Sequence, residues 1–193
     1  RAGRWEIERA SFLGEPVSIF LPPADGSSRM LASLTTGHYG TKVWASDDAG
    51  RAWSEVAAPT YPTQPEGAEG PEWKLVLIWA LERASGSLWA GTLPGGLFRS
   101  DDNGASWQLN ESLWQRKERL GWFGGGYPVP GIHTICAHPQ RGGEMLLGIS
   151  CGGAWTTRDG GASWNITAKG MRANFMPPEM ADDPNIQDAH RIV

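Results

Sequence analysis

Short apolar runs recur along the chain, and polar turns rich in Gly separate them, a pattern that predicts β-strands rather than helices. Six runs form three pairs, namely residues 17–21 with 30–34, 78–81 with 87–90, and 132–137 with 145–149. An aromatic residue lies beyond each pair, always two residues before a polar segment that recurs in every unit, at Trp44, Phe98 and Trp155. Beyond this aromatic residue each unit continues through a polar turn into one more short strand, so the pattern predicts four strands in each unit.

The polar turn before the last strand of each unit is an octapeptide that occurs three times, at residues 46–53, 100–107 and 157–164. A carboxylate at its third position can accept hydrogen bonds from turn N–H groups, the Gly at its fifth suits a positive φ, and the closing Trp can anchor the hairpin. Calcium binding is the functional alternative, but a calcium loop needs more oxygen ligands, so we favour a structural role. The shared positions are Ser46, Asp48, Gly50 and Trp53, then Ser100, Asp102, Gly104 and Trp107, then Thr157, Asp159, Gly161 and Trp164.

Four short strands in about 40–50 residues match one blade of a β-propeller. We therefore predict an all-β fold, a partial β-propeller of four-stranded antiparallel blades, with about three and a half blades of a six- or seven-bladed ring. The single domain spans residues 1–193, with blades at roughly 16–56, 75–110 and 131–168 and incomplete flanking blades at 1–15 and 186–193. Open blades expose strand edges, so we expect either the remaining blades of a longer chain or self-association.

The octapeptide resembles the Asp box, or BNR repeat, whose pattern is Ser-x-Asp-x-Gly-x-Thr-Trp. It departs from that pattern at Thr157, which replaces the first Ser, and at the seventh position. Similarity to sialidase-like or BNR-repeat glycosyl hydrolases is carried by residues 98–102, 131–133 and 188–191. The resemblance implies a propeller and a glycosidase or carbohydrate-binding class, but the Asp box itself lies away from the active face of the family's enzymes. The function therefore depends on other residues.

The composition agrees with a fold that has many turns, and the net charge argues against some classes of partner. The 193 residues include 26 Gly, 14 Pro and 11 Trp, and the net charge is −4. That balance argues against nucleic-acid binding, and the apolar runs are too short to cross a membrane. No signal peptide is visible, which favours a cytoplasmic location, although Arg1 in place of Met indicates that a natural N-terminus is missing. Nothing in the sequence predicts a cofactor, and Cys136 and Cys151 are interpreted as structural thiols.

Aligning the units identifies one equivalent position at the start of the first strand of each unit. In a propeller this position lies near the mouth of the central channel. This position holds Ser18, Trp79, His133 and His190 in turn. His38 and Tyr39 lie in a loop expected on the same face. The histidines can bind a ligand or backbone carbonyls, and His38, His133 and His190 could form a metal site if they converge. For Trp79 we weigh core packing above ligand binding.

Three long connections between units span residues 55–77, 108–131 and 165–188. We expect them to lie on this face and to carry the function, because long loops in a compact fold are usually functional. Their aromatic rings, arginine and carboxylates are residue types that suit sugar binding. For Trp114 and Phe175 we favour core packing over ligand binding. The ligand-binding candidates are His38, Tyr39, Trp79, Trp114, Trp122, His133, Arg172 and His190.

Three functions remain open, and the first is binding of a glycan or protein through the loop face. The second is sialidase- or xyloglucanase-like glycoside hydrolysis, which needs paired carboxylates, and Glu179 with Asp182 or Asp183 is the best local pair. The third is a metal-assisted hydrolase that uses the channel histidines. Sialidases usually carry an Arg-Ile-Pro motif, which this sequence lacks, so the order is binding, glycosidase, metal enzyme.

Overall fold

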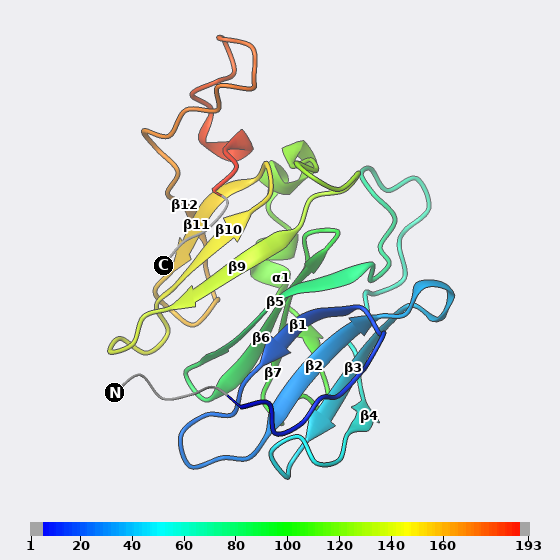
Figure 1. Ribbon diagram of the computed structural model, residues 1–193. Helices are drawn as coiled ribbons and strands as arrows, with labels where there is room; N and C mark the ends of the chain where they lie inside the picture. The colour runs from blue at the N-terminus through cyan, green and yellow to red at the C-terminus, as the bar shows by residue number, and fades with distance from the viewer. Residues whose placement is uncertain (1–5, 190–193) are drawn as a thin grey trace.

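The computed structural model describes residues 6–189, which form three four-stranded antiparallel sheets (Figure 1). The first sheet contains β1 (Val17–Leu21), β2 (Met30–Thr35), β3 (Thr41–Ser46) and β4 (Ser54–Val56). The second contains β5 (Leu77–Ala84), β6 (Ser87–Leu93), β7 (Leu97–Ser100) and β8 (Gln108–Leu109). The third contains β9 (Ile132–Ala137), β10 (Met145–Ile149), β11 (Gly153–Thr157) and β12 (Asn165–Ile166).

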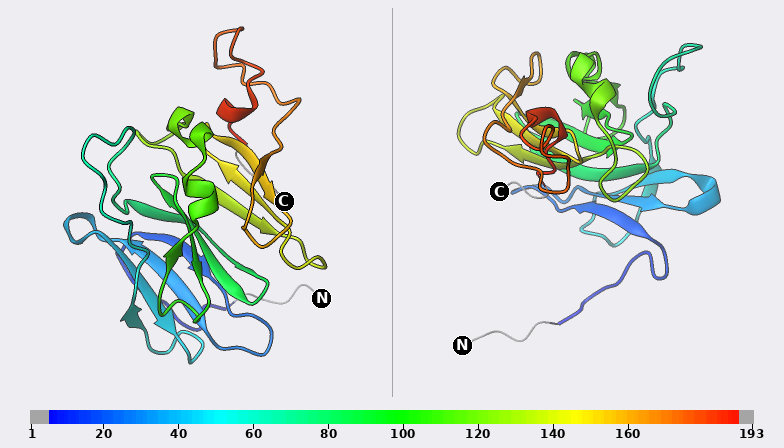
Figure 2. Two further views of the ribbon diagram at one scale, coloured as in Figure 1. Left: turned by 180° about the vertical axis from the view of Figure 1, so that it is seen from behind. Right: turned by 90° about the horizontal axis from the view of Figure 1, so that it is seen from above.

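Each sheet keeps its strands in chain order, and the first strands of neighbouring sheets contact one another, β1 with β5 and β5 with β9. The three sheets are therefore the blades of a propeller arc, with β1, β5 and β9 innermost (Figure 2). This confirms the predicted partial β-propeller. No helix among the described residues is long and apolar enough to cross a membrane.

Two apolar cores lie between the blades, because alternate residues of each strand face the neighbouring sheet. Leu31 and Val43 of the first blade pack with Phe98 of the second. Trp89 of the second blade packs with Leu147 and Trp155 of the third. Phe98 and Trp155 thus occupy the two blade interfaces, where they are buried, and Trp44 of the first blade is half-buried beside Phe12.

The octapeptide hairpins join β3 to β4, β7 to β8 and β11 to β12. In the second hairpin the Ser100 hydroxyl accepts the N–H of Gly104 at 2.8 Å and donates to Asp102 at 2.8 Å. Asp102 also accepts the Ser106 hydroxyl at 2.5 Å and the Ser106 N–H at 2.8 Å, and these hydrogen bonds lower its pKa to about 2. Gly104 has a φ of 87°, which favours glycine at this position.

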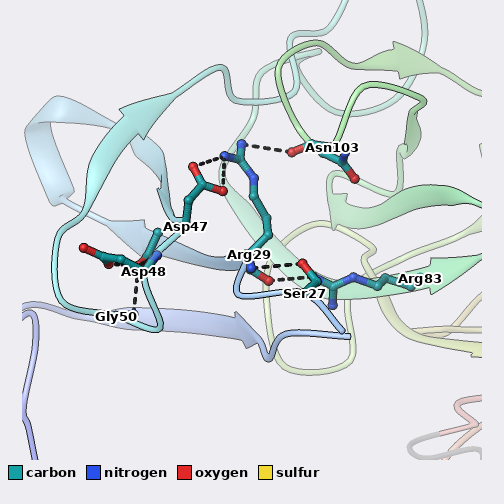
Figure 3. A network of polar contacts seen from close by, with 8 residues as sticks. Ser27, Arg29, Asp47, Asp48, Gly50, Arg83 and Asn103 are labelled. Carbon is teal, nitrogen blue, oxygen red and sulfur yellow. Dashed lines mark hydrogen bonds and ion pairs between the residues drawn. The ribbon is translucent and has the colours of Figure 1, made fainter. Parts of the chain in front are cut away.

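Arginine side chains link the first blade to the second beside the hairpins (Figure 3). Arg29 donates to both carboxylate oxygens of Asp47 at 2.9 and 2.8 Å and to the carbonyl of Asn103 at 3.1 Å. Arg83 in turn donates to the carbonyl of Arg29 at 3.1 Å. The hairpin side of the arc is therefore held by polar contacts that cross between blades.

The remaining regular elements are short and lie in the connections. They are the 3-10 turn η1 (Gly37–Tyr39), helix α1 (Glu111–Trp114), and the 3-10 turns η2 (Lys117–Gly121) and η3 (Pro184–Ile186). Asn110 caps α1 by accepting the Leu113 N–H at 3.2 Å, as its side chain favours at a helix start.

Candidate functional site

The two ends of the blades differ in what they carry. The octapeptide hairpins lie at one end, at the lower left of Figure 1, and η1 with the long connections lies at the other. We call the second end the loop face, formed by residues 36–40, 57–76, 110–131, 150–152 and 167–189. The loop face is the candidate site because its connections are long and differ from blade to blade.

The repeat-aligned position is a β-bulge in each innermost strand. The pairing register skips Ser18 between Val17 and Ile19, Trp79 between Ile78 and Ala80, and His133 between Ile132 and Thr134. A bulge leaves its residue out of the ladder and redirects the side chain. Sequence alignment found the position, but the bulge comes from pairing with the second strand and has no local sequence signal.

Two of these bulge residues meet at the loop face together with a tyrosine. The Trp79 ring lies edge to face against His133 at 5.7 Å between centroids and against Tyr127 at 5.5 Å. Glycines leave room for both rings, because a Cβ at Gly131 would lie 2.7 Å from Trp79 and a Cβ at Gly148 would lie 2.9 Å from His133. The aligned Trp79 and His133 therefore form an aromatic cluster near the propeller axis, with Tyr127 half exposed beside it.

Polar groups from the loop 150–152 and from Asp188 border this cluster. The Ser150 hydroxyl accepts the N–H of Gly125 at 3.0 Å, and a Cβ at Gly125 would lie 2.8 Å from Asp188. Burial, and secondarily the charge of Asp188, raises the pKa of the Cys151 thiol to about 11. The thiol is therefore protonated at neutral pH, which does not suit a cysteine nucleophile.

An aromatic anchor holds the connection 57–76 and helix α1 against the second blade. The Trp114 ring, 5% exposed, packs at 5.2 Å from both Tyr61 and Trp73. The guanidinium of Arg119 stacks 3.8 Å from the centroid of Trp114. The hydroxyl of Tyr61 accepts the Gly96 N–H at 2.9 Å. Trp114 therefore anchors loops and does not present its ring at the surface.

A second anchor ties the connection 110–131 to the last connection. Trp122, also 5% exposed, packs 5.8 Å from Trp155, and its indole N–H donates to Asn185 at 3.0 Å. Asn185 in turn donates to the carbonyl of Glu118 at 2.9 Å. Two connections from different blades thus share one hydrogen-bonded junction, which the buried Trp122 ring supports.

Most exposed apolar side chains lie on loop-face residues. Of the twelve large hydrophobic residues exposed in the described part of the chain, eight belong to this face. They are Tyr39, Val76, Leu120, Phe123, Tyr127, Met171, Phe175 and Met180. Phe175 is 60% exposed, so its predicted core packing is wrong, because its connection extends beyond the third blade. Sequence reasoning missed Val76, Leu120, Met171 and Met180, since an isolated apolar residue in a loop carries no pattern.

The histidines do not form a metal site in the residues described. His38 packs against Tyr39 on η1 at 5.6 Å between centroids, His133 lies beside Trp79, and His190 lies outside the described residues. The described residues contain no group of three or more His, Cys, Asp or Glu placed to hold a metal ion.

The acidic candidates of the last connection have local partners. Asp182 forms an exposed ion pair with Arg172 at 2.6 Å. Asp183 accepts the Asn185 N–H at 2.9 Å at the start of η3. Glu179 is exposed on the same connection. Arg172, Asp182 and Asp183 therefore shape this connection.

Comparison with known proteins does not assign the chain to a family. No family model and no curated protein matches it. Solved structures similar to it include YCF48 from Cyanidioschyzon merolae, at 14% identity and a TM-score of 0.49, covering 80% of this chain and 38% of that one. The GH74 xyloglucanase from Xanthomonas campestris has 17% identity and a TM-score of 0.49, covering 79% of this chain and 23% of that one.

This chain thus spans less than half the length of either protein. At these identities and TM-scores the likenesses carry no argument about activity. The Asp-box resemblance of the octapeptides stays a prediction.

Proposed function

We propose that this chain is a binding module that takes a protein or peptide partner with apolar side chains on its loop face. The observation that carries the proposal is that eight of the twelve large hydrophobic side chains exposed in the described residues lie on loop-face segments from all three blades. Six of the eight are aromatic residues or Met, the types enriched at protein interfaces.

The anchored loops support this proposal energetically. Trp114 and Trp122 anchor the connections 57–76 and 110–131, so the exposed side chains of these two connections are already held in place before a partner arrives. Less conformational entropy is then lost on binding, which favours affinity.

Carbohydrate binding and glycoside hydrolysis are the alternatives that the Asp-box resemblance suggests. Glycoside hydrolysis needs two carboxyl groups placed as a pair across the scissile bond. Asp182 is held by Arg172 in an exposed ion pair, and Asp183 accepts the Asn185 N–H at the start of η3. Both carboxylates therefore have partners within their own connection, and we favour binding over hydrolysis.

A display library of random linear peptides, selected on the intact chain, tests the proposal. We expect enriched peptides with apolar residues whose affinity falls about tenfold or more in the loop-face variant Phe123→Ser, Tyr127→Ser, Phe175→Ser. The control is Ile7→Ser, Leu13→Ser, which removes hydrophobic side chains that are even more exposed but lie outside the loop face, and it should keep the affinity.

Equal peptide affinity for the loop-face variant and the wild type would contradict the proposal. So would a selection that enriches no peptide, run beside an oligosaccharide panel that yields a ligand dependent on Tyr127.

A further inference from the structure

The aromatic cluster of Trp79, Tyr127 and His133 keeps ring surface open to a ligand. Trp79 and His133 are half-buried, and Tyr127 is 44% exposed. Both ring contacts of Trp79 are edge to face, with the ring planes at 73°, and a ring that presents its edge keeps its own faces free of its partner. A cation placed over the face of a Trp or Tyr ring is attracted by the ring quadrupole.

The exposed surface of Trp79 does not belong to an open blade edge. Trp79 lies in β5 of the middle blade, and β5 contacts β1 on one side and β9 on the other. Tyr127 lies in the connection from the second blade to the third, and His133 lies in β9. The cluster is therefore exposed along the inner rim of the arc, between blades that the structure describes.

The glycines at 124–126 bring Tyr127 and a carboxylate together. A Cβ at Gly124 would lie 1.6 Å from the carbonyl oxygen of Tyr127, so only glycine permits this tight turn. A Cβ at Gly125 would lie 2.8 Å from a carboxylate oxygen of Asp188. One short segment thus carries the exposed ring of Tyr127 and packs against the Asp188 carboxylate.

Asp188 makes the electrostatic potential beside the cluster negative. The Cys151 sulfur would lie 3.4 Å from the same Cβ at Gly125. Burial, and after it the charge of Asp188, raises the pKa of this thiol to about 11. Among the described residues no basic side chain offsets this effect on the thiol. A cationic group is therefore favoured here over a neutral or anionic one.

The loop face as a whole is acidic, and its arginines are engaged within it. Its segments hold nine Asp and Glu residues and six Lys and Arg residues. Arg116 and Arg172 each form an ion pair with a neighbouring carboxylate at 2.6 Å, and Arg119 stacks on Trp114. The surplus charge of this face is negative, which attracts a basic partner.

We propose that the aromatic cluster receives a cationic side chain, lysine or arginine, of the peptide that binds the loop face. The cation lies over the faces of Trp79 and Tyr127, beside the charge of Asp188. This inference rests on the proposed function and narrows it. Because Tyr127 also belongs to the exposed apolar residues of the loop face, the partner carries its basic residue next to apolar ones.

The affinities of paired peptides for the intact chain test this inference. The probes are a library-selected peptide and the same peptide with its basic residues replaced, one at a time, by uncharged norleucine. We expect one replacement to weaken binding to wild type about tenfold and to change binding to Tyr127→Leu less than twofold. Tyr127→Phe, which keeps the ring, should keep the tenfold preference, and Asp188→Asn should reduce it. Circular dichroism checks that each variant is folded.

A second probe, n-butylammonium, tests the cation site without any peptide. Titration of the intact chain should give a saturable shift of the Trp79 indole N–H resonance in NMR spectra, and n-butanol at equal concentration should not. The shift should be lost in Tyr127→Leu and kept in Tyr127→Phe. A Trp79 resonance that n-butylammonium leaves unmoved would overturn the inference, whatever the peptide selection gives.

Two peptide results would also overturn the inference while the proposed function stands. One is a selection that enriches apolar peptides without a basic residue. The other is a norleucine replacement that weakens binding equally in wild type and in Tyr127→Leu. A selection that enriches no peptide counts instead against the proposed function, so the two failures are distinct.

Discussion

The hairpin end and the loop face of this arc are built in opposite ways. At the hairpin end the same contacts recur, since Ser46, Ser100 and Thr157 each accept the N–H of the octapeptide Gly and each donate to the octapeptide Asp. At the loop face each connection has its own length, anchor and exposed side chains. Repetition thus stabilises the blades, and the segments that do not repeat carry the surface on which we place binding.

The comparison also separates stability from recognition. Buried aromatic residues at blade interfaces should govern unfolding, and exposed aromatic residues on the loop face should govern affinity. Four substitutions or titrations test this separation, beginning with the largest expected effect on stability.

Trp155→Ala should cause the largest loss. The ring is fully buried between the second and third blades, so its removal leaves a cavity and costs about 3–5 kcal/mol of unfolding free energy. Urea unfolding followed by fluorescence or circular dichroism gives the value. The matched change at the loop face, Phe175→Ala, should stay within about 0.5 kcal/mol. Similar losses for both would remove the proposed separation.

Ser100→Ala should cost less, about 1–3 kcal/mol, because it leaves the buried Gly104 N–H without its acceptor. Its partner in the same hairpin, Ser106→Ala, removes an exposed hydroxyl that donates to Asp102 and should cost less, since water replaces it. Urea unfolding midpoints of the two variants make the comparison. A greater loss for Ser106→Ala would show that the buried hydroxyl does not hold the turn.

Acid should weaken the hairpin end selectively. Hydrogen bonds lower the pKa of Asp102 and Asp159 from 3.8 to about 2 in the folded chain, so the unfolded chain takes up these protons first. Their contribution is present above pH 4 and is lost as pH falls from about 4 to 2. Unfolding midpoints measured across this range should fall less steeply for Asp102→Asn, Asp159→Asn. An unchanged pH profile in that variant would place the acid sensitivity elsewhere.

The repeated features of the chain could be predicted from the sequence, and the features that do not repeat could not. The octapeptides and the aromatic residues before them predicted the blades, because each unit solves the same packing problem. The aligned position predicted that Trp79 and His133 share a face, and the two rings meet. The β-bulges and the junction of Trp122 with Asn185 depend on pairing between distant segments and have no local pattern. The exposed position of Phe175 escaped prediction for the same reason.

The loop-face variant, for which we expect the smallest change in stability, tests the central claim most directly. The measurement is the affinity of a library-selected peptide for the loop-face variant and for wild type, with the unfolding midpoint recorded on the same samples. The account predicts binding that is about tenfold or more weaker with an unfolding free energy within about 0.5 kcal/mol of wild type. Unchanged affinity, or affinity lost only together with the fold, would contradict it.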